Sequence, residues 1–290
     1  MNHRIVPLEA GLWLVATPIG SARDITLRAL DVLASADLLA AEDTRTARKL
    51  MEIHGVPLNG REIVAYHDHS GARTREKLVE RIKEGASVAY VSEAGTPLIS
   101  DPGFALGRDV IAEGLPIWPV PGASAVLSAL CVAGLPTDRF EFLGFPPPKK
   151  SARATLWAEL ANSPSTLVLY ESPKRAAALF EELAEALGPD RPAALCRELT
   201  KRFEETRRGS LAELRDDLAE RPPRGECVIV VGRGASGAVS EDDIDTALRA
   251  ALETMRVKDA ATAVAGSFGL HRRDVYQRAL ALSSGMLDES

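Results

Sequence analysis

The chain has 290 residues, of which 46% are hydrophobic and 26% are charged, and its net charge is −6. This composition is typical of a globular protein long enough for two domains, and the negative charge disfavours a nonspecific nucleic-acid coat, because such proteins are usually basic. The N-terminus lacks the long apolar core of a signal peptide, and no run reaches the length of a membrane span. We therefore expect a cytoplasmic protein with no membrane partner.

Apolar runs alternate with amphipathic runs along the first 120 residues. Short apolar runs bounded by turn residues predict buried strands, whereas the spacing of Leu27, Leu30 and Leu33 is helical. This alternation predicts an α/β fold with a mainly parallel sheet and helices on its faces. We predict strands at 12–16, 37–41, 62–66, 87–91 and 116–120, and helices at 26–35, 44–54 and 74–83.

A second series of elements follows Pro121-Gly122, which we interpret as a linker. A Gly/Ser-rich segment at 232–240 is typical of a flexible linker, so the expected domains are 1–121, 122–234 and 241–290. We predict helices at 123–133 and 173–187, strands at 140–144, 166–170, 193–198 and 227–231, and a charged segment at 201–208.

The last fifty residues differ from the rest because they contain only helical patterns. Acidic residues in the first turn indicate a helix that begins near 240, and two further helices are predicted at 257–268 and 271–282, separated by Gly269. This order predicts a helix-turn-helix. A small helical cap on the larger domain is the alternative.

Cysteine and histidine placement argues against disulfides and metals. Cys131, Cys196 and Cys227 are scattered and form no CxxC pair, which predicts reduced thiols that are buried for packing. His67 and His69 are the only histidines that lie close together, and the sequence shows no obvious third ligand in a metal-site spacing. We therefore predict no metal site.

Turn residues gather where four of the predicted strands end. The most elaborate of these segments is VSEAGTPLISDPG, residues 91–103, which holds two turn-forming clusters. The carboxyl ends of parallel strands share one edge of the sheet, so these segments would line a single crevice suited to a cofactor and a substrate. A plain strand-to-helix connection is the alternative for Gly95-Thr96-Pro97 taken alone. The other segments are 17–20, 42–45 and 67–70.

No common nucleotide or hydrolase motif accompanies this crevice. The patterns GxGxxG, GxxxxGK[ST] and GxSxG are absent from the sequence. Gly-Thr-Pro and Pro-Gly turns expose backbone without adding charge, which favours a ligand held by amides and apolar walls. A nucleoside-bearing sulfonium is such a ligand.

Several long motifs occur in an order that closely resembles the ribosomal RNA small subunit methyltransferase I family. They are LWLVATPIGSARDITLRALDVLASADLLAAEDTRTARKL, HDHS, VSEAGTPLISDPG, VPGASAVLSALCVAGLPTDRFEFLGF and LVLYESPKR. The resemblance covers about 12–231, and the helical tail matches the family's usual terminal domain. It implies a two-domain tetrapyrrole-methylase-like fold, as in class III S-adenosylmethionine methyltransferases, plus a small C-terminal helix-turn-helix domain.

The same resemblance implies the activity, the cofactor and the partners. The family consists of S-adenosyl-L-methionine-dependent enzymes that methylate the 2′-hydroxyl of a cytidine ribose in 16S rRNA near the decoding centre. The implied partners are 16S rRNA or the small ribosomal subunit, and a second copy of the chain in a homodimer. The alternatives are a tetrapyrrole C-methyltransferase and a noncatalytic RNA-binding protein of ribosome assembly.

The cofactor residues follow from residue-by-residue matching. Gly95-Thr96-Pro97 stands where related tetrapyrrole methylases have Gly-Asp-Pro, so Thr96 weakens any expectation of a charge contact there. Leu98 would pack on the cofactor, and the strand at 227–229 is a weaker candidate. The predicted cofactor-binding residues are Ile19, Gly95, Thr96, Pro97, Ile99, Ser124, Ala125 and Tyr170.

Methyl transfer from a sulfonium depends mainly on positioning, although a base or an oxyanion stabiliser would help a weakly acidic hydroxyl. The alternative for Glu42 and Asp43 is to cap the helix that begins near Thr44, with Arg45 as their ion-pair partner. In the tail, Arg272, Arg273 and Arg278 are predicted RNA contacts. The predicted catalytic residues are Glu42, Asp43, His67, Asp68, His69 and Asp101, with Arg45 as a phosphate or carboxylate partner.

Overall fold

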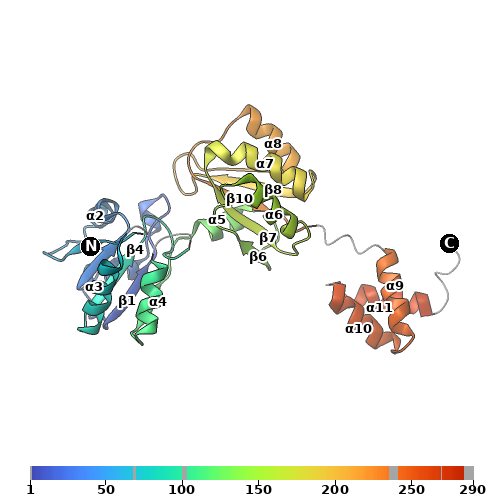
Figure 1. Cartoon of the computed structure of the whole chain (residues 1–290), viewed down its shortest axis with the longest axis horizontal. Coiled ribbons are helices and arrows are strands. Elements are labelled where there is room, and N and C mark those ends of the chain that lie inside the picture. The colour runs from blue at the N-terminus through green and yellow to red at the C-terminus, as the bar shows by residue number, and fades with distance from the viewer. Residues whose placement is uncertain (1, 68–69, 100–102, 235–240, 269, 284–290) are drawn as a thin grey trace. The chain divides into compact units, whose positions relative to one another are not determined.

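The computed structural model describes residues 2–67, 70–99, 103–234, 241–268 and 270–283 (Figure 1). The chain divides into two compact units. The first comprises Met1–Ala158 and Ser165–Gly232, and the second comprises Glu159–Pro164 and Arg233–Ser290. The domain boundaries expected from the sequence stay a prediction.

The first sheet of the larger unit has five strands, all parallel, in the order β3-β2-β4-β1-β5. The parallel sheet predicted from the alternation of apolar and amphipathic runs is therefore confirmed. Its strands are β1 (Gly11–Val15), β2 (Leu38–Ala41), β3 (Ile63–Ala65), β4 (Ser87–Val91) and β5 (Ile117–Val120).

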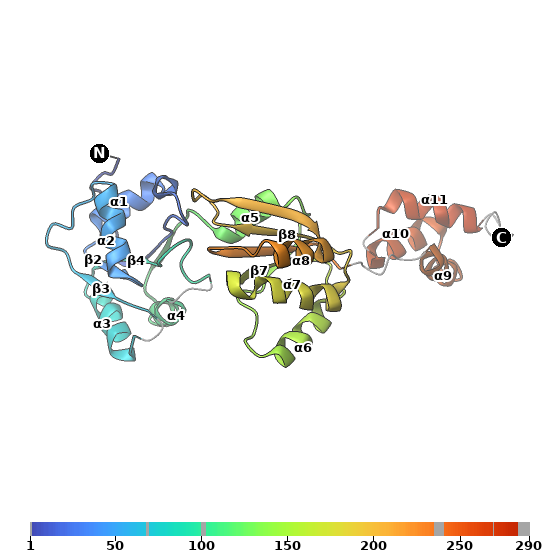
Figure 2. The same cartoon turned by 90° about the horizontal axis from the view of Figure 1, so that it is seen from above.

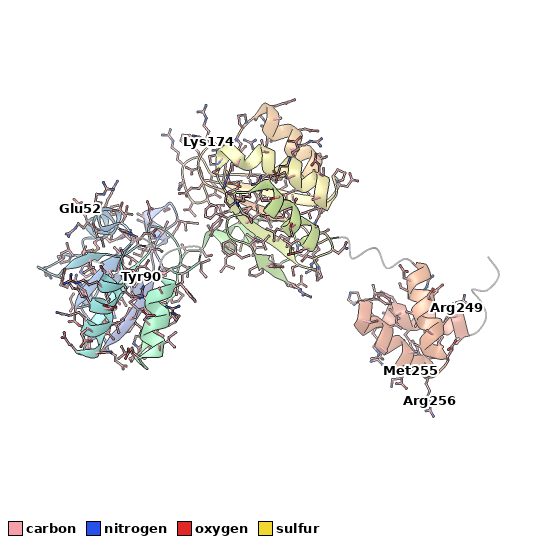
Figure 3. All side chains as sticks on the ribbon, viewed as in Figure 1. Glu52, Tyr90, Lys174, Arg249, Met255 and Arg256 are labelled. Atoms are coloured by element: carbon pink, nitrogen blue, oxygen red, sulfur yellow. The ribbon has the colours of Figure 1, made fainter. Side chains whose placement is uncertain are left out.

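Helices cover both faces of this sheet, because alternate strand residues point to opposite sides. Along β4, Ala89 and Val91 pack with α1 (Leu27–Ser35) and α2 (Thr44–Ile53). Val88 and the fully buried Tyr90 pack on the other face with α3 (Ala72–Lys83) and α4 (Phe104–Ala112). Tyr90 lies among the strands of this sheet in Figure 3.

The second sheet has the order β6-β7-β10-β8-β9. β6 is parallel to β7, but the other three pairings are antiparallel. One face packs on α5 (Ala125–Ala133), while α7 (Pro173–Leu187) and α8 (Leu211–Glu220) pack side by side (Figure 2). The strands are β6 (Phe140–Phe142), β7 (Thr166–Glu171), β8 (Pro192–Arg197), β9 (Glu205–Ser210) and β10 (Cys227–Val231).

The predictions from sequence missed several elements and misplaced one cysteine. Cys196 and Cys227 are buried as predicted, but Cys131 is exposed. The buried face of α5 is formed by Val126, Ala129, Leu130 and Ala133, and Cys131 lies off that face. The missed elements are the short 3-10 helix Ala22–Asp24, α4, α6 (Lys150–Leu160), α8 and β9.

The smaller unit contains the three helices predicted for the tail: α9 (Glu241–Leu252), α10 (Val257–Phe268) and α11 (Arg272–Ser283). Leu248, Val264 and Val275 contribute one residue from each helix to a common core. Arg278 of α11 pairs with Asp245 of α9 through two hydrogen bonds, so this arginine holds the helices together. Within the described residues, no helix is long and apolar enough to cross a membrane.

Candidate active site

The order of the first sheet gives a topological switch point between β1 and β4. These strands are neighbours, but β1 leads to α1 on one face of the sheet and β4 leads to α4 on the other. Loops that diverge in this way leave an opening at the carboxyl ends of the two strands, and ligands of open α/β sheets bind at such switch points. The Gly-Thr-Pro segment follows β4 directly.

The loops after β1 and β4 are joined at this edge. The Thr17 N–H donates to the Gly95 carbonyl over 2.9 Å, and the Gly95 N–H donates to the Thr17 carbonyl over 3.0 Å. Gly95 has φ +84°, a conformation that costs little for glycine and more for any residue with a Cβ. The pair therefore fixes the backbone of the Gly-Thr-Pro turn against the first loop.

A third loop, after β5, is tied to the same turn. The Thr96 hydroxyl donates to the Ala123 carbonyl over 3.0 Å. A Cβ on Gly122 would lie 2.9 Å from the Ala16 Cβ, so the third loop also approaches the end of β1 closely. Thr96 therefore joins two loops of the site.

The rest of the Gly-Thr-Pro loop combines strain with exposed apolar surface. Leu98 has φ +71°, which is strained for a residue with a side chain, and such strain concentrates at functional sites. Pro97 is buried, whereas Ile99 is 43% exposed. Asp101 lies outside the described residues.

The acidic residues after β2 bind backbone groups. The Glu42 carboxylate accepts the Glu93 N–H over 2.9 Å, which links the β2 and β4 loops. Asp43 is the N-cap of α2 and accepts the N–H groups of Arg45 and Thr46 over 2.7 and 3.4 Å. The hydrogen bond from the Arg45 N–H lowers the pKa of Asp43, so this carboxylate is a poor base. The arrangement matches the capping alternative.

Arg45 and His67 sit at the same edge of the sheet but face solvent. The Arg45 guanidinium lies 3.3 Å from the Asp43 carboxylate, and 91% of its side chain is exposed. His67 follows β3, is exposed, and donates its backbone N–H to the Ser70 hydroxyl over 2.9 Å. Asp68 and His69 lie outside the described residues.

The predicted cofactor residues beyond the Gly-Thr-Pro turn come from three places. Ser124 is the N-cap of α5, which Ala125 begins, and its hydroxyl accepts the Leu127 N–H over 3.4 Å. Ile19 is buried in the same apolar core as α5. Tyr170 stands near the end of β7, with its ring edge-on to Phe142 and Phe145 at centroid distances of 5.0 and 5.5 Å.

Sequence reasoning missed one contact of the first loop. The Ser21 N–H donates to the Thr200 hydroxyl over 3.0 Å, and a Cβ on Gly20 would lie 2.6 Å from both the Thr200 hydroxyl and the Lys201 Cγ. The loop after β8 therefore belongs to the surroundings of the site. Nothing local in the sequence signals a contact between residues 179 positions apart.

These residues fit a nucleoside sulfonium. Exposed backbone at Gly122 lies beside the N-terminus of α5, where N–H groups suit the carboxylate of an amino acid. The exposed side chain of Ile99 supplies apolar surface, and the buried Ile19 lies against the Gly95 turn. Among the residues that the structure describes, no three His, Cys, Asp or Glu side chains are grouped to hold a metal ion.

Comparison with known proteins decides the family. The model of the tetrapyrrole (corrin/porphyrin) methylases matches residues 11–215, which contain the loops at the switch point and most of the second sheet. The chain belongs to the tetrapyrrole methylase family. The fold and the cofactor expected from the sequence are thereby confirmed, because this is a family of S-adenosylmethionine-dependent methyltransferases. A second model, described as the RsmI C-terminal HTH domain, matches residues 238–283.

Within the methylase family, this chain resembles proteins named ribosomal RNA small subunit methyltransferase I. The one from Mesorhizobium japonicum is 45% identical over 95% of this chain and 93% of its own. The one from Haemophilus influenzae is 40% identical over 93% of this chain and 96% of its own. This member of the family therefore shares nearly its full length with them.

Solved structures support the methylase fold. The methyltransferase CobJ superposes with a TM-score of 0.60 at 21% identity, covering 78% of this chain and 95% of its own. Uroporphyrin-III C-methyltransferase from Thermus thermophilus, in complex with S-adenosylhomocysteine, gives 0.54 at 19% identity, covering 79% and 99%.

Proposed function

We propose that this methylase transfers the methyl group of S-adenosylmethionine to the 2′-hydroxyl of a cytidine in 16S rRNA near the decoding centre. The observation that carries the proposal is the near full-length identity of 38–45% with the rRNA small subunit methyltransferase I proteins. The matched C-terminal helix-turn-helix domain at 238–283 supports a nucleic-acid substrate. The small ribosomal subunit is the preferred form of that substrate.

The joined loops after β1, β4 and β5 would hold the cofactor. The Gly95-Thr96-Pro97 backbone and the N-terminus of α5 at Ser124 and Ala125 would bind its amino-acid end, while Ile19, Ile99 and Tyr170 would contact its apolar surfaces. When bound, S-adenosylmethionine supplies an activated methyl group. The chain's contribution is to place the acceptor hydroxyl in line with that group, because correct positioning of two reactants lowers the barrier to their reaction.

The described acidic residues contribute to catalysis mainly through the loops that they hold. Glu42 orders the β4 loop through the Glu93 N–H, and Asp43 begins α2. Arg45 is almost fully exposed beside them and would meet an RNA phosphate. His67, Asp68, His69 and Asp101 remain proposed catalytic residues that would act on the ribose hydroxyl as a base or as a stabiliser of the oxyanion.

An incubation of purified small subunits with labelled S-adenosylmethionine tests the proposal. The modified nucleotide is then mapped. A single 2′-O-methylcytidine in 16S rRNA near the decoding centre is the expected product. Label on a base atom would overturn the 2′-hydroxyl as the acceptor. Label transferred only to a tetrapyrrole, offered in a parallel incubation, would overturn the proposal in favour of the tetrapyrrole C-methyltransferase. Binding of subunits without any transfer would identify a noncatalytic assembly protein.

We also propose that the enzyme works as a homodimer in the cytoplasm. Phe104 and Ile111 lie seven residues apart on one side of α4 and are 69% and 62% exposed. Two large apolar side chains on one helix face suit an interface between copies. Light scattering of the full chain tests this part. The unaltered chain should have the mass of two copies, and Phe104→Ser with Ile111→Ser should lower the mass to that of one copy.

A further inference from the structure

The connection between β8 and β9 exposes an aromatic and a basic side chain together. Phe203 is 62% exposed, and the guanidinium carbon of Arg202 lies 5.4 Å from the centre of its ring. Within the described ranges, Arg202 forms no ion pair, because no carboxylate oxygen lies within 4.0 Å of its guanidinium nitrogens. The loop therefore presents an exposed aromatic ring and a guanidinium side by side.

This connection is held in a strained and well-bonded conformation. Glu198 and Thr200 have φ of +51° and +63°, which disfavours both residues unless their surroundings fix them. The Glu198 carboxylate accepts the Glu226 N–H over 3.0 Å and the Lys201 ammonium over 3.1 Å. The Thr200 N–H donates to the Glu204 carboxylate over 2.7 Å. Arg202 and Phe203 are therefore presented on a rigid support.

The same support contacts the edge of the first sheet. The Thr200 hydroxyl accepts the Ser21 N–H, and Gly20 has no room for a Cβ beside Thr200 and Lys201. Gly20 and Ser21 continue the loop that bonds to Gly95. Arg202 and Phe203 therefore belong to a loop that contacts the loop after β1, one of those proposed to hold the cofactor.

We propose that Phe203 and Arg202 recognise the RNA substrate, with a base stacked on the Phe203 ring and a phosphate bound by Arg202. The inference rests on the proposed function and names residues that select its substrate. Aromatic rings stack on unpaired bases, and guanidinium groups bind phosphates in two-pronged fashion. A chain with a net charge of −6 gains little from nonspecific attraction to RNA, so localised contacts of this kind carry more of the binding.

The experiment compares Phe203→Ala, Phe203→Leu, Phe203→Trp and Arg202→Ala in the full chain. Phe140→Ala, an exposed phenylalanine on β6 at the opposite edge of the same sheet, is the matched control. Each variant is assayed for methylation of small subunits over a range of subunit concentrations, and calorimetry measures its affinity for S-adenosylmethionine.

Phe203→Ala and Phe203→Leu should raise KM for subunits about tenfold, the loss expected for one stacked base, while leaving the cofactor affinity unchanged. Phe203→Trp should restore KM, since a larger ring stacks as well. Arg202→Ala should raise KM and reduce its salt dependence. Phe140→Ala should behave as the unaltered chain.

Unchanged KM in Phe203→Ala and Arg202→Ala would overturn the inference and leave the proposed function intact. Full activity in Phe203→Leu would also overturn the stacking role and indicate an apolar contact with a protein instead. If the unaltered chain methylates no RNA, the proposed function and this inference fail together.

Discussion

Thr17 and Gly95 exchange two backbone hydrogen bonds, of 2.9 and 3.0 Å, at the carboxyl ends of β1 and β4. These strands are neighbours, but their connecting loops leave toward opposite faces of the sheet. The paired residues therefore span the point at which the sheet opens. Changes at this pair should affect the cofactor more than they affect the fold.

Gly95→Ala tests this expectation. Its Cβ would lie 3.4 Å from the Ile19 side chain, which is nearly an ordinary contact, so the main effect is the φ of +84°. The strain should lower the free energy of unfolding by about 1 kcal/mol and move the turn, lowering affinity for S-adenosylmethionine by about tenfold.

Gly55→Ala is the matched control, because Gly55 also has positive φ, +65°, and nothing lies within 4 Å of its added Cβ. Thermal unfolding should show similar decreases in stability for the two variants. Calorimetric titration should show weakened cofactor binding only for Gly95→Ala. Equal affinities in the two folded variants would remove the Gly-Thr-Pro turn from the site.

Thr96→Val removes the hydroxyl that joins the β4 loop to Ala123. The shape of the side chain is kept, but the Ala123 carbonyl is deprived of its 3.0 Å donor, at a cost of about 1 kcal/mol. We expect weaker cofactor binding, because the two loops that would enclose the ligand are no longer tied.

Thr155→Val removes a comparable bond, from an exposed helical hydroxyl to the Ser151 carbonyl over 3.2 Å. Since Thr155 lies on α6, its replacement should leave cofactor affinity unchanged. Matching affinities in Thr96→Val and the unaltered chain would mean that the tie between the loops has no role in binding.

Glu205 predicts a pH dependence of stability. Hydrogen bonds from Arg207 and then Arg197 lower the pKa of Glu205 from 4.5 to about 2. A carboxyl whose pKa is depressed by folding stabilises the native state above its unfolded pKa, and this contribution disappears as pH falls from about 4.5 through about 2.

Glu205→Gln should therefore flatten the fall in unfolding free energy over that acid range, as measured by urea denaturation at a series of pH values. The variant should be less stable than the unaltered chain at neutral pH and approach it near the folded pKa of about 2. Glu141→Gln, an exposed position on β6, serves as the control. A Glu205→Gln profile parallel to that of the unaltered chain would contradict the assigned ion pairs.

Local patterns were sufficient to predict the first sheet and the helical tail. Buried runs such as 87–91 lie on a parallel sheet covered on both faces, so their apolar character is continuous and easily seen. Strand β9 was missed because its sequence ETRRGS is polar. Arg207 forms ion pairs with Glu205 and Asp217, and Arg208 donates to the Val132 carbonyl. Helix α8 carried a readable signal, the capping box of Ser210 and Glu213, that the predictions from sequence overlooked.

The parts of the candidate site that were missed depend on distant contacts. Gly95-Thr96-Pro97 and Glu42-Asp43 stand directly after predicted strands. Their position at the same edge of the sheet could therefore be predicted from the sequence. The bond between Ser21 and Thr200 joins two loops far apart in sequence. The exposure of Cys131 depends on which face of α5 meets the second sheet, and α5 is apolar on nearly every side.

The tail offers a test that separates RNA binding from packing. Arg272 and Arg273 open α11 and are exposed, whereas Arg278 is 22% exposed in its ion pair with Asp245. Arg272→Ala with Arg273→Ala should weaken binding to small subunits and reduce its salt dependence, by about one unit in log–log slope for each phosphate that the variant no longer binds.

Arg278→Ala should instead lower the stability of the helical unit by about 1 kcal/mol, because it breaks a half-buried pair between α9 and α11. Two measurements on the full chain separate RNA binding from packing: subunit binding across a salt series and thermal unfolding. Cofactor affinity should be unaltered in both variants. The double variant should retain its unfolding temperature, since its side chains face solvent. An unchanged salt slope in the double variant would show that the tail is a structural cap and that the RNA is bound elsewhere.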